Sequence, residues 1–125
     1  PAAIVGFTGH VFFDLIYTDH LWLSWALSTG ALGFVFGFAI RRNSLRQGVF
    51  SRHDMVRFNV VQAAVNIAIF GLIAPTLDVL FYQHSTTIVF TQGWIVSIIN
   101  LLTVAVFGTI TLKLYANYKL KQNKQ

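Results

Sequence analysis

Apolar residues form long uninterrupted runs in this sequence, and charged residues gather in the short segments between them. A helix needs about 20 apolar residues to cross a hydrocarbon core of about 30 Å, and three runs reach that length. They cover residues 21–40, 58–77 and 88–112. Residues 1–13 are also apolar, but they are too few to cross. The pattern predicts an all-α polytopic membrane protein with three transmembrane helices and a short N-terminal interfacial segment.

The second helix is expected to begin before its apolar part. Ser51 and Asp54 have the spacing of a capping box, in which a hydroxyl and a carboxylate satisfy free backbone N–H groups. The predicted spans are therefore about 21–40, 54–77 and 88–112. Pro75 marks either the far end of the second helix or a kink in it. Residues 113–125 form a polar tail with a disordered end, and the whole chain is one membrane domain.

Composition and charge support this interpretation, because 55% of the residues are hydrophobic and only 10% are charged. All basic residues fall in the first connection or in the tail: Arg41, Arg42, Arg46, Arg52, Arg57, Lys113, Lys119, Lys121 and Lys124. Three spans place both segments on one side of the bilayer, whereas two or four spans are expected to separate them. The other side receives Asp14, Asp19 and Asp78. Topology thus explains the basic charge without a nucleic-acid partner.

Small residues recur along one face of the first span. Thr29, Gly33 and Gly37 are spaced four residues apart, so this glycine face has few side chains and admits the backbone of another helix. Ordinary packing within the chain or against a neighbour is the favoured interpretation. A specific homodimer seam is the alternative.

A stripe of carboxamides follows Arg57 along the second span. Asn59, Gln62 and Asn66 fall on one side of a helix, where lipid cannot satisfy their hydrogen-bonding groups. This carboxamide stripe predicts hydrogen bonds between helices, with Ser97 and Asn100 of the third span as candidate partners. A polar path for a translocated substrate is the alternative.

Histidines and aromatic residues lie near the ends of the predicted spans. His10, His20 and His84 are candidate pigment ligands, although an interfacial imidazole is more often solvated or bonded to backbone. Aromatic anchors at the membrane surface are predicted at Tyr17, Trp22, Trp25, Tyr82 and Trp94. No catalytic motif, metal site or cysteine nucleophile is recognisable, so an enzyme is not expected.

The segment Phe50-Ser51-Arg52, followed by Val56-Arg57-Phe58-Asn59-Val60-Val61-Gln62-Ala63, resembles a known signature. It is similar to the F-S-R and V-R-F-N-x-x-Q-A motif of the twenty-kilodalton channel-subunit family of the chloroplast inner-envelope translocon. The resemblance covers roughly residues 20–75 and matches Arg57, Asn59 and Gln62 to motif positions. Members have four helices, so the resemblance implies that the first helix is absent here or reduced to residues 1–13.

The resemblance implies a non-enzymatic subunit of a plastid membrane complex, similar to a protein-import channel subunit, with its basic loop and C-terminus in the stroma. The alternative is an accessory subunit of a photosystem and its antenna in the thylakoid, with chlorophyll or carotenoid bound. Both hypotheses give the protein other membrane subunits and the lipid bilayer as partners.

Overall fold

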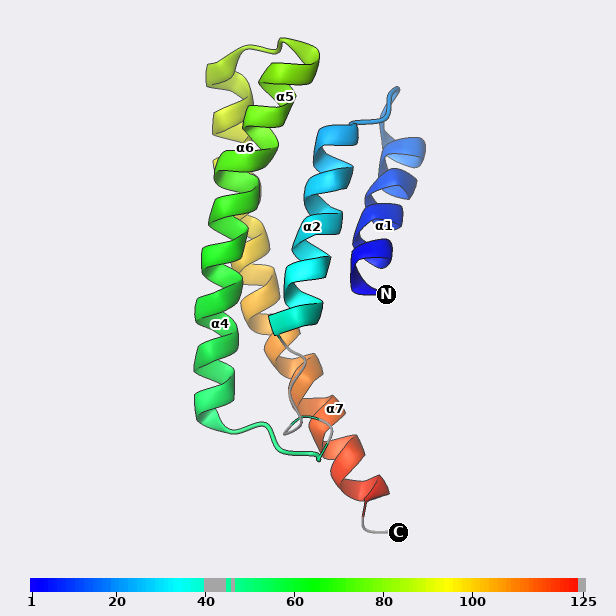
Figure 1. The fold of residues 1–125 in the computed structure, drawn as a ribbon, viewed down its shortest axis with the longest axis vertical. Helices are drawn as coiled ribbons and strands as arrows, with labels where there is room; N and C mark the ends of the chain where they lie inside the picture. Colours follow the sequence, from blue (N-terminus) through cyan, green and yellow to red (C-terminus); the bar gives the residue numbers. More distant parts are fainter. Residues whose placement is uncertain (40–44, 46, 124–125) are drawn as a thin grey trace.

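The computed structural model describes residues 1–39, 45 and 47–123, and this part of the chain is helical without a strand (Figure 1). Two short helices come first, followed by two long ones that each contain a π-helical turn. Their bounds are Ala2–Tyr17 (α1), Leu23–Ala39 (α2), Arg52–Asn66 (α4), Ile67–Ile73 (η1), Ala74–Tyr82 (α5), Thr86–Thr103 (α6), Val104–Gly108 (η2) and Thr109–Gln122 (α7). The all-α prediction is confirmed, but the described residues form four continuous helices rather than three.

The additional helix is α1, so the prediction of an interfacial segment at the N-terminus is wrong. It is 16 residues long and lies antiparallel beside α2. A carbon added at Gly6 would lie 2.5 Å from the Thr29 carbonyl oxygen, and one added at Gly33 would collide with the Ala2 carbonyl. Glycines on both helices therefore allow backbone contact, and the glycine face of α2 receives α1.

The third helix begins with the predicted capping box. The Ser51 hydroxyl accepts from the Asp54 N–H at 3.2 Å, and the Asp54 carboxylate accepts from the Ser51 N–H at 3.1 Å. The helix continues through Pro75 to Tyr82, beyond the predicted end of the span. Proline has no N–H, and its ring crowds the carbonyl four residues earlier. The π-helical turn η1 directly precedes it and accommodates this defect.

The fourth helix is the most exposed of the long elements, and it extends past the predicted tail boundary. It runs over Thr86–Gln122. The prediction that the chain is disordered from Lys119 onward is therefore wrong for residues 119–122. Leu, Lys and Gln favour helix, and Lys119 and Lys121 in the last turn complement the helix dipole. Its apolar side chains face outward, as expected for contact with lipid.

Two helices, Arg52–Tyr82 and Thr86–Gln122, are long and apolar enough to cross a membrane. The shorter α1 and α2 are apolar as well, with 16 and 17 residues. All four are roughly aligned along the long axis of the molecule (Figure 1).

Residues 47–51, just before α4, and the C-terminal helix α7 lie together at one end of the molecule, called here the basic end (Figure 1). A carbon added at Gly48 would lie 2.6 Å from the Leu120 backbone nitrogen. The described residues Arg52, Arg57, Lys113, Lys119 and Lys121 belong to the elements at this end, while Arg41, Arg42, Arg46 and Lys124 lie outside the described residues. The added helix precedes both basic segments, so a fourth helix does not separate them.

The opposite end, called the acidic end, holds the two connections 18–22 and 83–85 (Figure 1). Asp14 and Asp78 lie near it, yet both are buried within helices, with 3% and 0% of their surface exposed. Trp25 is 4% exposed and stacks on Phe70 at 6.1 Å, so its prediction as a membrane-surface anchor is wrong.

Candidate ligand-binding cavity

A cavity of about 700 Å³ opens between α1, α2, η1 and the fourth helix. Ligand sites of small molecules typically measure roughly 300–1,000 Å³ and combine apolar walls with a few polar groups. The wall of this main cavity includes His10, Phe13, Asp14, Thr18, Asp19, His20, Trp22, Trp25, Thr29, Leu32, Phe70, Gln92, Val96, Asn100 and Val104. Aromatic rings, carboxamides, imidazoles and a buried carboxylate therefore meet in one space.

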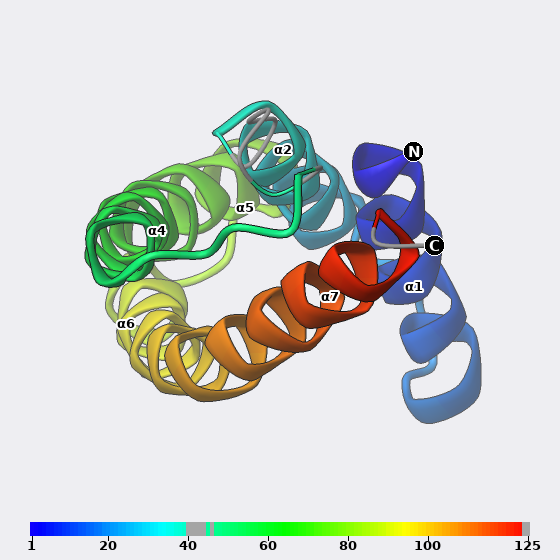
Figure 2. The same ribbon diagram turned by 90° about the horizontal axis from the view of Figure 1, so that it is seen from below.

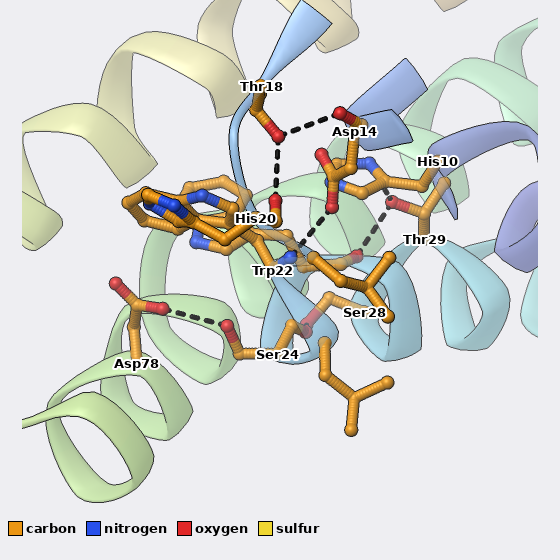
Figure 3. Close-up of polar contacts among 12 residues, drawn as sticks. His10, Asp14, Thr18, His20, Trp22, Ser24, Ser28, Thr29 and Asp78 are labelled. Carbon is orange, nitrogen blue, oxygen red and sulfur yellow. Dashed lines mark hydrogen bonds and ion pairs between the residues drawn. The ribbon is translucent and has the colours of Figure 1, made fainter. Parts of the chain in front are cut away.

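Asp14 joins α1 to the start of α2 on the wall of this cavity (Figure 3). Its Oδ2 accepts a hydrogen bond from the Trp22 N–H at 2.8 Å. Tyr82 does the same for the next amide, because its hydroxyl accepts from the Leu23 N–H at 3.1 Å. The first N–H groups of a helix have no partner within the helix. The start of α2 is thus capped by side chains from α1 and α5, and the carboxylate also suits the positive end of the helix dipole.

His10 connects the same carboxylate to the side of α2. Its Nε2 lies 3.6 Å from Asp14 Oδ1, and its Nδ1 lies 3.2 Å from the Thr29 hydroxyl. Thr29 also lies 2.9 Å from the Trp25 carbonyl, which can only accept. When the hydroxyl donates to that carbonyl, it can only accept from His10, so Nδ1 carries the proton. Asp14, His10 and Thr29 thus lie next to one another (Figure 3), and Nε2 of His10 can donate to Asp14 only when both ring nitrogens carry a proton.

The 18–22 connection turns sharply between the two helices. The Thr18 hydroxyl lies 2.6 Å from the His20 carbonyl and 2.9 Å from the Asp14 carbonyl (Figure 3). These contacts close the end of α1 and direct the chain back toward α2. They place His20 and Trp22 beside each other, stacked with ring centroids 5.8 Å apart.

A second buried carboxylate, Asp78, lies on the other side of Trp22. Its Oδ1 accepts from the Ser24 hydroxyl at 2.8 Å, and its Oδ2 lies 3.1 Å from His84 Nδ1. His84 contacts Trp22 with ring centroids 5.4 Å apart and stacks on Tyr82 at 5.6 Å. Trp22 is therefore surrounded by aromatic and imidazole rings from both connections at the acidic end.

The predicted histidine sites fall into two places. His10 and His20 line the main cavity, while His84 lies behind Trp22 and bonds to Asp78. Among the described residues, no group of three or more His, Asp or Glu side chains could hold a metal ion.

The carboxamide stripe contacts the fourth helix, but not through the predicted partners. Asn59 donates to the Thr109 hydroxyl at 3.0 Å, and Gln62 donates to the Leu101 carbonyl at 3.2 Å. Asn66 bonds back to Gln62 at 3.0 Å. Asn100 instead lines the main cavity. Ser97 is buried, and its hydroxyl finds no partner among the described groups.

Arg57 lies at the basic end, away from the main cavity. Together with Gln62 and several apolar residues it lines a separate small cavity of about 40 Å³. The motif positions Arg57, Asn59 and Gln62 are thus not brought together with the histidines.

Sequence reasoning treated Asp14, Asp78 and Trp25 as features of the membrane surface and did not predict a cavity. One signal was available, because His10 and Asp14 are four residues apart and face the same side of a helix. Their partners are Trp22, which directly precedes α2, and Thr29 within α2, and only the fold shows that pairing.

The cavity and its helices belong to a region that matches a known family. The sequence profile described as ECF-type riboflavin transporter, S component, matches residues 1–117. The chain belongs to this family. It is a family of transporter components and not of enzymes, in agreement with the expectation of a non-enzymatic membrane subunit.

Bacterial proteins of the UPF0397 group are similar over almost the whole chain. A relative from Lactococcus lactis subsp. cremoris is 42% identical over 118 residues, which are 94% of this chain and 65% of the relative. Relatives from Enterococcus faecalis and Staphylococcus aureus are 41% and 38% identical over 119 residues, with 95% of this chain and 65% of each relative covered. The chain thus spans just under two thirds of these relatives. No solved structure matches it.

These matches contradict the function that the sequence resemblance implied. The similarity to the chloroplast translocon family does not reflect membership, because the matching family is one of transporter S components. The photosystem alternative is wrong for the same reason. The relatives are bacterial, so a plastid location with a stromal loop is wrong too. A short motif such as R-F-N-x-x-Q-A describes a helix face that packs against another helix, and unrelated membrane proteins share this need.

Proposed function

We propose that this protein is the substrate-binding membrane subunit of a bacterial ECF-type transporter and that it binds riboflavin, or a closely related planar vitamin, in the main cavity. The observation that carries the proposal is the cavity of about 700 Å³ with aromatic and polar groups on its wall. The family description supplies the substrate class.

The chemistry of the wall suits a flat heteroaromatic ligand with a polyhydroxyl chain. Trp22 and Phe13 place aromatic rings on the wall, and aromatic surface favours planar molecules. Gln92 and Asn100 carry both donors and acceptors, and Asp14 can accept from a hydroxyl. The ligand thus gains apolar contact for its ring and hydrogen bonds for its edge, the combination that gives small-molecule sites affinity and orientation.

The proposed orientation follows from the separation of charge along the molecule. Basic residues are retained on the cytoplasmic side of a bacterial membrane, so the basic end faces the cytoplasm. The two long helices then cross the bilayer with α1 and α2 packed beside them, and the two connections of the acidic end face outward. A cavity near that end is positioned to capture a ligand from outside the cell. Transport across the membrane requires the other components of the transporter as partners.

The direct test is a titration of the purified protein with riboflavin in mild detergent. Binding is measured as quenching of flavin fluorescence. We expect Trp22→Ala to weaken binding about tenfold or more, because a stacked aromatic contact contributes about 1–3 kcal/mol and 1.4 kcal/mol is a factor of ten. Trp94→Ala is the matched control, since Trp94 packs beside Gly71 and does not line the cavity.

Two results would count against the proposal. If the wild-type protein does not bind riboflavin, the proposed substrate is wrong. Equal weakening by Trp22→Ala and Trp94→Ala would move the site away from the cavity.

A further inference from the structure

Asp78 is a buried carboxylate that lies outside the lining of the main cavity. It has no exposed surface, and its two oxygens are engaged by Ser24 and His84. A buried carboxylate is costly unless polar partners surround it. Ser24 comes from α2 and His84 from the connection that follows α5, so Asp78 links the end of α5 to both.

The backbone before His84 is shaped for this contact. Gln83 ends α5 with φ of 54°, in the left-handed region that a residue other than glycine rarely adopts. This turn brings His84 back over the last turn of α5, where Nδ1 reaches Asp78 at 3.1 Å. An unfavoured backbone conformation persists when the surrounding contacts hold it. The His84 contact with Asp78 is one such restraint.

His84 in turn holds a residue of the cavity wall. Its ring contacts Trp22 with centroids 5.4 Å apart, and Trp22 also stacks on His20. Tyr82 adds a second connection, because its hydroxyl accepts from the Leu23 N–H. The 18–22 connection is therefore attached to the end of α5 through Trp22 and Leu23.

We propose that Asp78 and His84 form a latch that holds the 18–22 connection against α5 and so positions Trp22 as a wall of the main cavity. Neither residue lines that cavity, so both are positioning residues that act through Trp22. The expected effect of the latch on ligand affinity rests on the proposed function. Its expected effect on the mobility of the 18–22 connection does not.

Hydrogen–deuterium exchange of the segment 18–25 tests the latch in the ligand-free protein. We expect His84→Ala to speed exchange of this segment about tenfold and His84→Asn to restore most of the protection, because an Asn amide can still donate to Asp78. His84 is 43% exposed, so neither substitution removes core packing. The matched control is His53→Ala at the basic end, where an exposed histidine lies in the first turn of α4.

The same variants are then titrated with riboflavin. If the latch positions Trp22, His84→Ala weakens binding about tenfold and His84→Asn binds nearly as wild type does. The latch would be overturned if His84→Ala leaves the exchange rate of the segment 18–25 unchanged, or if His84→Asn exchanges as fast as His84→Ala. Faster exchange with unchanged riboflavin affinity would overturn the positioning role. If even wild type fails to bind riboflavin while exchange responds as expected, the substrate assignment fails and the latch stands.

Discussion

Asp14 and Asp78 show how a buried carboxylate can be accommodated in an apolar helix. Asp14 accepts from the Trp22 N–H and lies beside His10, while Asp78 accepts from Ser24 and contacts His84. Asp14 takes its partners from the preceding turn of α1 and from the start of α2, and Asp78 takes its partners from α2 and from the connection after α5. The net gain from such bonds is modest, but removing one partner leaves the other unsatisfied and costs about 1–3 kcal/mol.

Asp14→Ala is expected to destabilise the protein by about 1–3 kcal/mol, because the partly buried N–H of Trp22 loses its acceptor. Asp14→Asn retains an acceptor oxygen and should lose less. Thermal unfolding in mild detergent measures both effects as shifts in midpoint.

The control for Asp14 is Asp19→Ala, which removes an exposed carboxylate from the neighbouring connection. A surface change of this kind is expected to stay within about 0.5 kcal/mol. Equal shifts for the Asp14 and Asp19 variants would show that the Trp22 contact has no special role.

At the scale of elements, close backbone approach explains the two tightest helix pairs. The α1–α2 pair meets at Gly6 and Gly33, and the contact of α6 with η1 is made at Gly93. A carbon at Gly93 would collide with the Phe70 carbonyl and the Pro75 ring. The π-helical turn before Pro75 and the glycine opposite it thus belong to one packing arrangement. A proline inside a span is tolerated when neighbouring elements adapt to it.

Gly33→Ala should separate α1 from α2, because the added methyl group meets the Ala2 backbone. The expected cost is about 1–3 kcal/mol, as for other overpacked sites. A fall in the thermal midpoint in mild detergent measures it.

Gly9→Ala supplies the matched comparison, since a carbon at Gly9 meets nothing within 4 Å. It should be neutral or slightly stabilising, because alanine favours helix more than glycine does. A destabilised Gly9→Ala together with an unaffected Gly33→Ala would contradict the packing described for α1.

The extent of the helices could be predicted only in part at this scale. The capping box at Ser51 and the apolar runs located the long helices, because capping and hydrophobicity are local properties. The helical packing of residues 2–17 could not be recognised, since α1 is too short to identify as a span by length. Its place depends on contact with α2.

At the scale of the whole molecule, the main cavity and the basic residues lie toward different ends of the long axis. Basic segments lie together at one end, and the main cavity extends toward the other, where two connections meet around Trp22 (Figure 2 shows the view from the basic end). The proposed function, in which a ligand enters from outside the cell, is consistent with this arrangement.

The orientation can be tested with single cysteines, because the native chain has none. Gln83→Cys lies at the acidic end and Gln47→Cys at the basic end, and both positions are exposed. In intact bacterial cells we expect a membrane-impermeant maleimide to label Gln83→Cys readily, and Gln47→Cys only after the membrane is permeabilised. The reverse pattern would invert the proposed topology.

The helical class, the long apolar helices and the grouping of basic residues into two segments could all be predicted from the sequence. These properties follow from composition and local pattern, which need no knowledge of which helices touch. The tertiary structure alone decided the helix count, the burial of Asp14 and Asp78, and the cavity that His10, Trp22 and Asn100 share. Such features depend on contacts between residues far apart in the chain, and no local pattern specifies them.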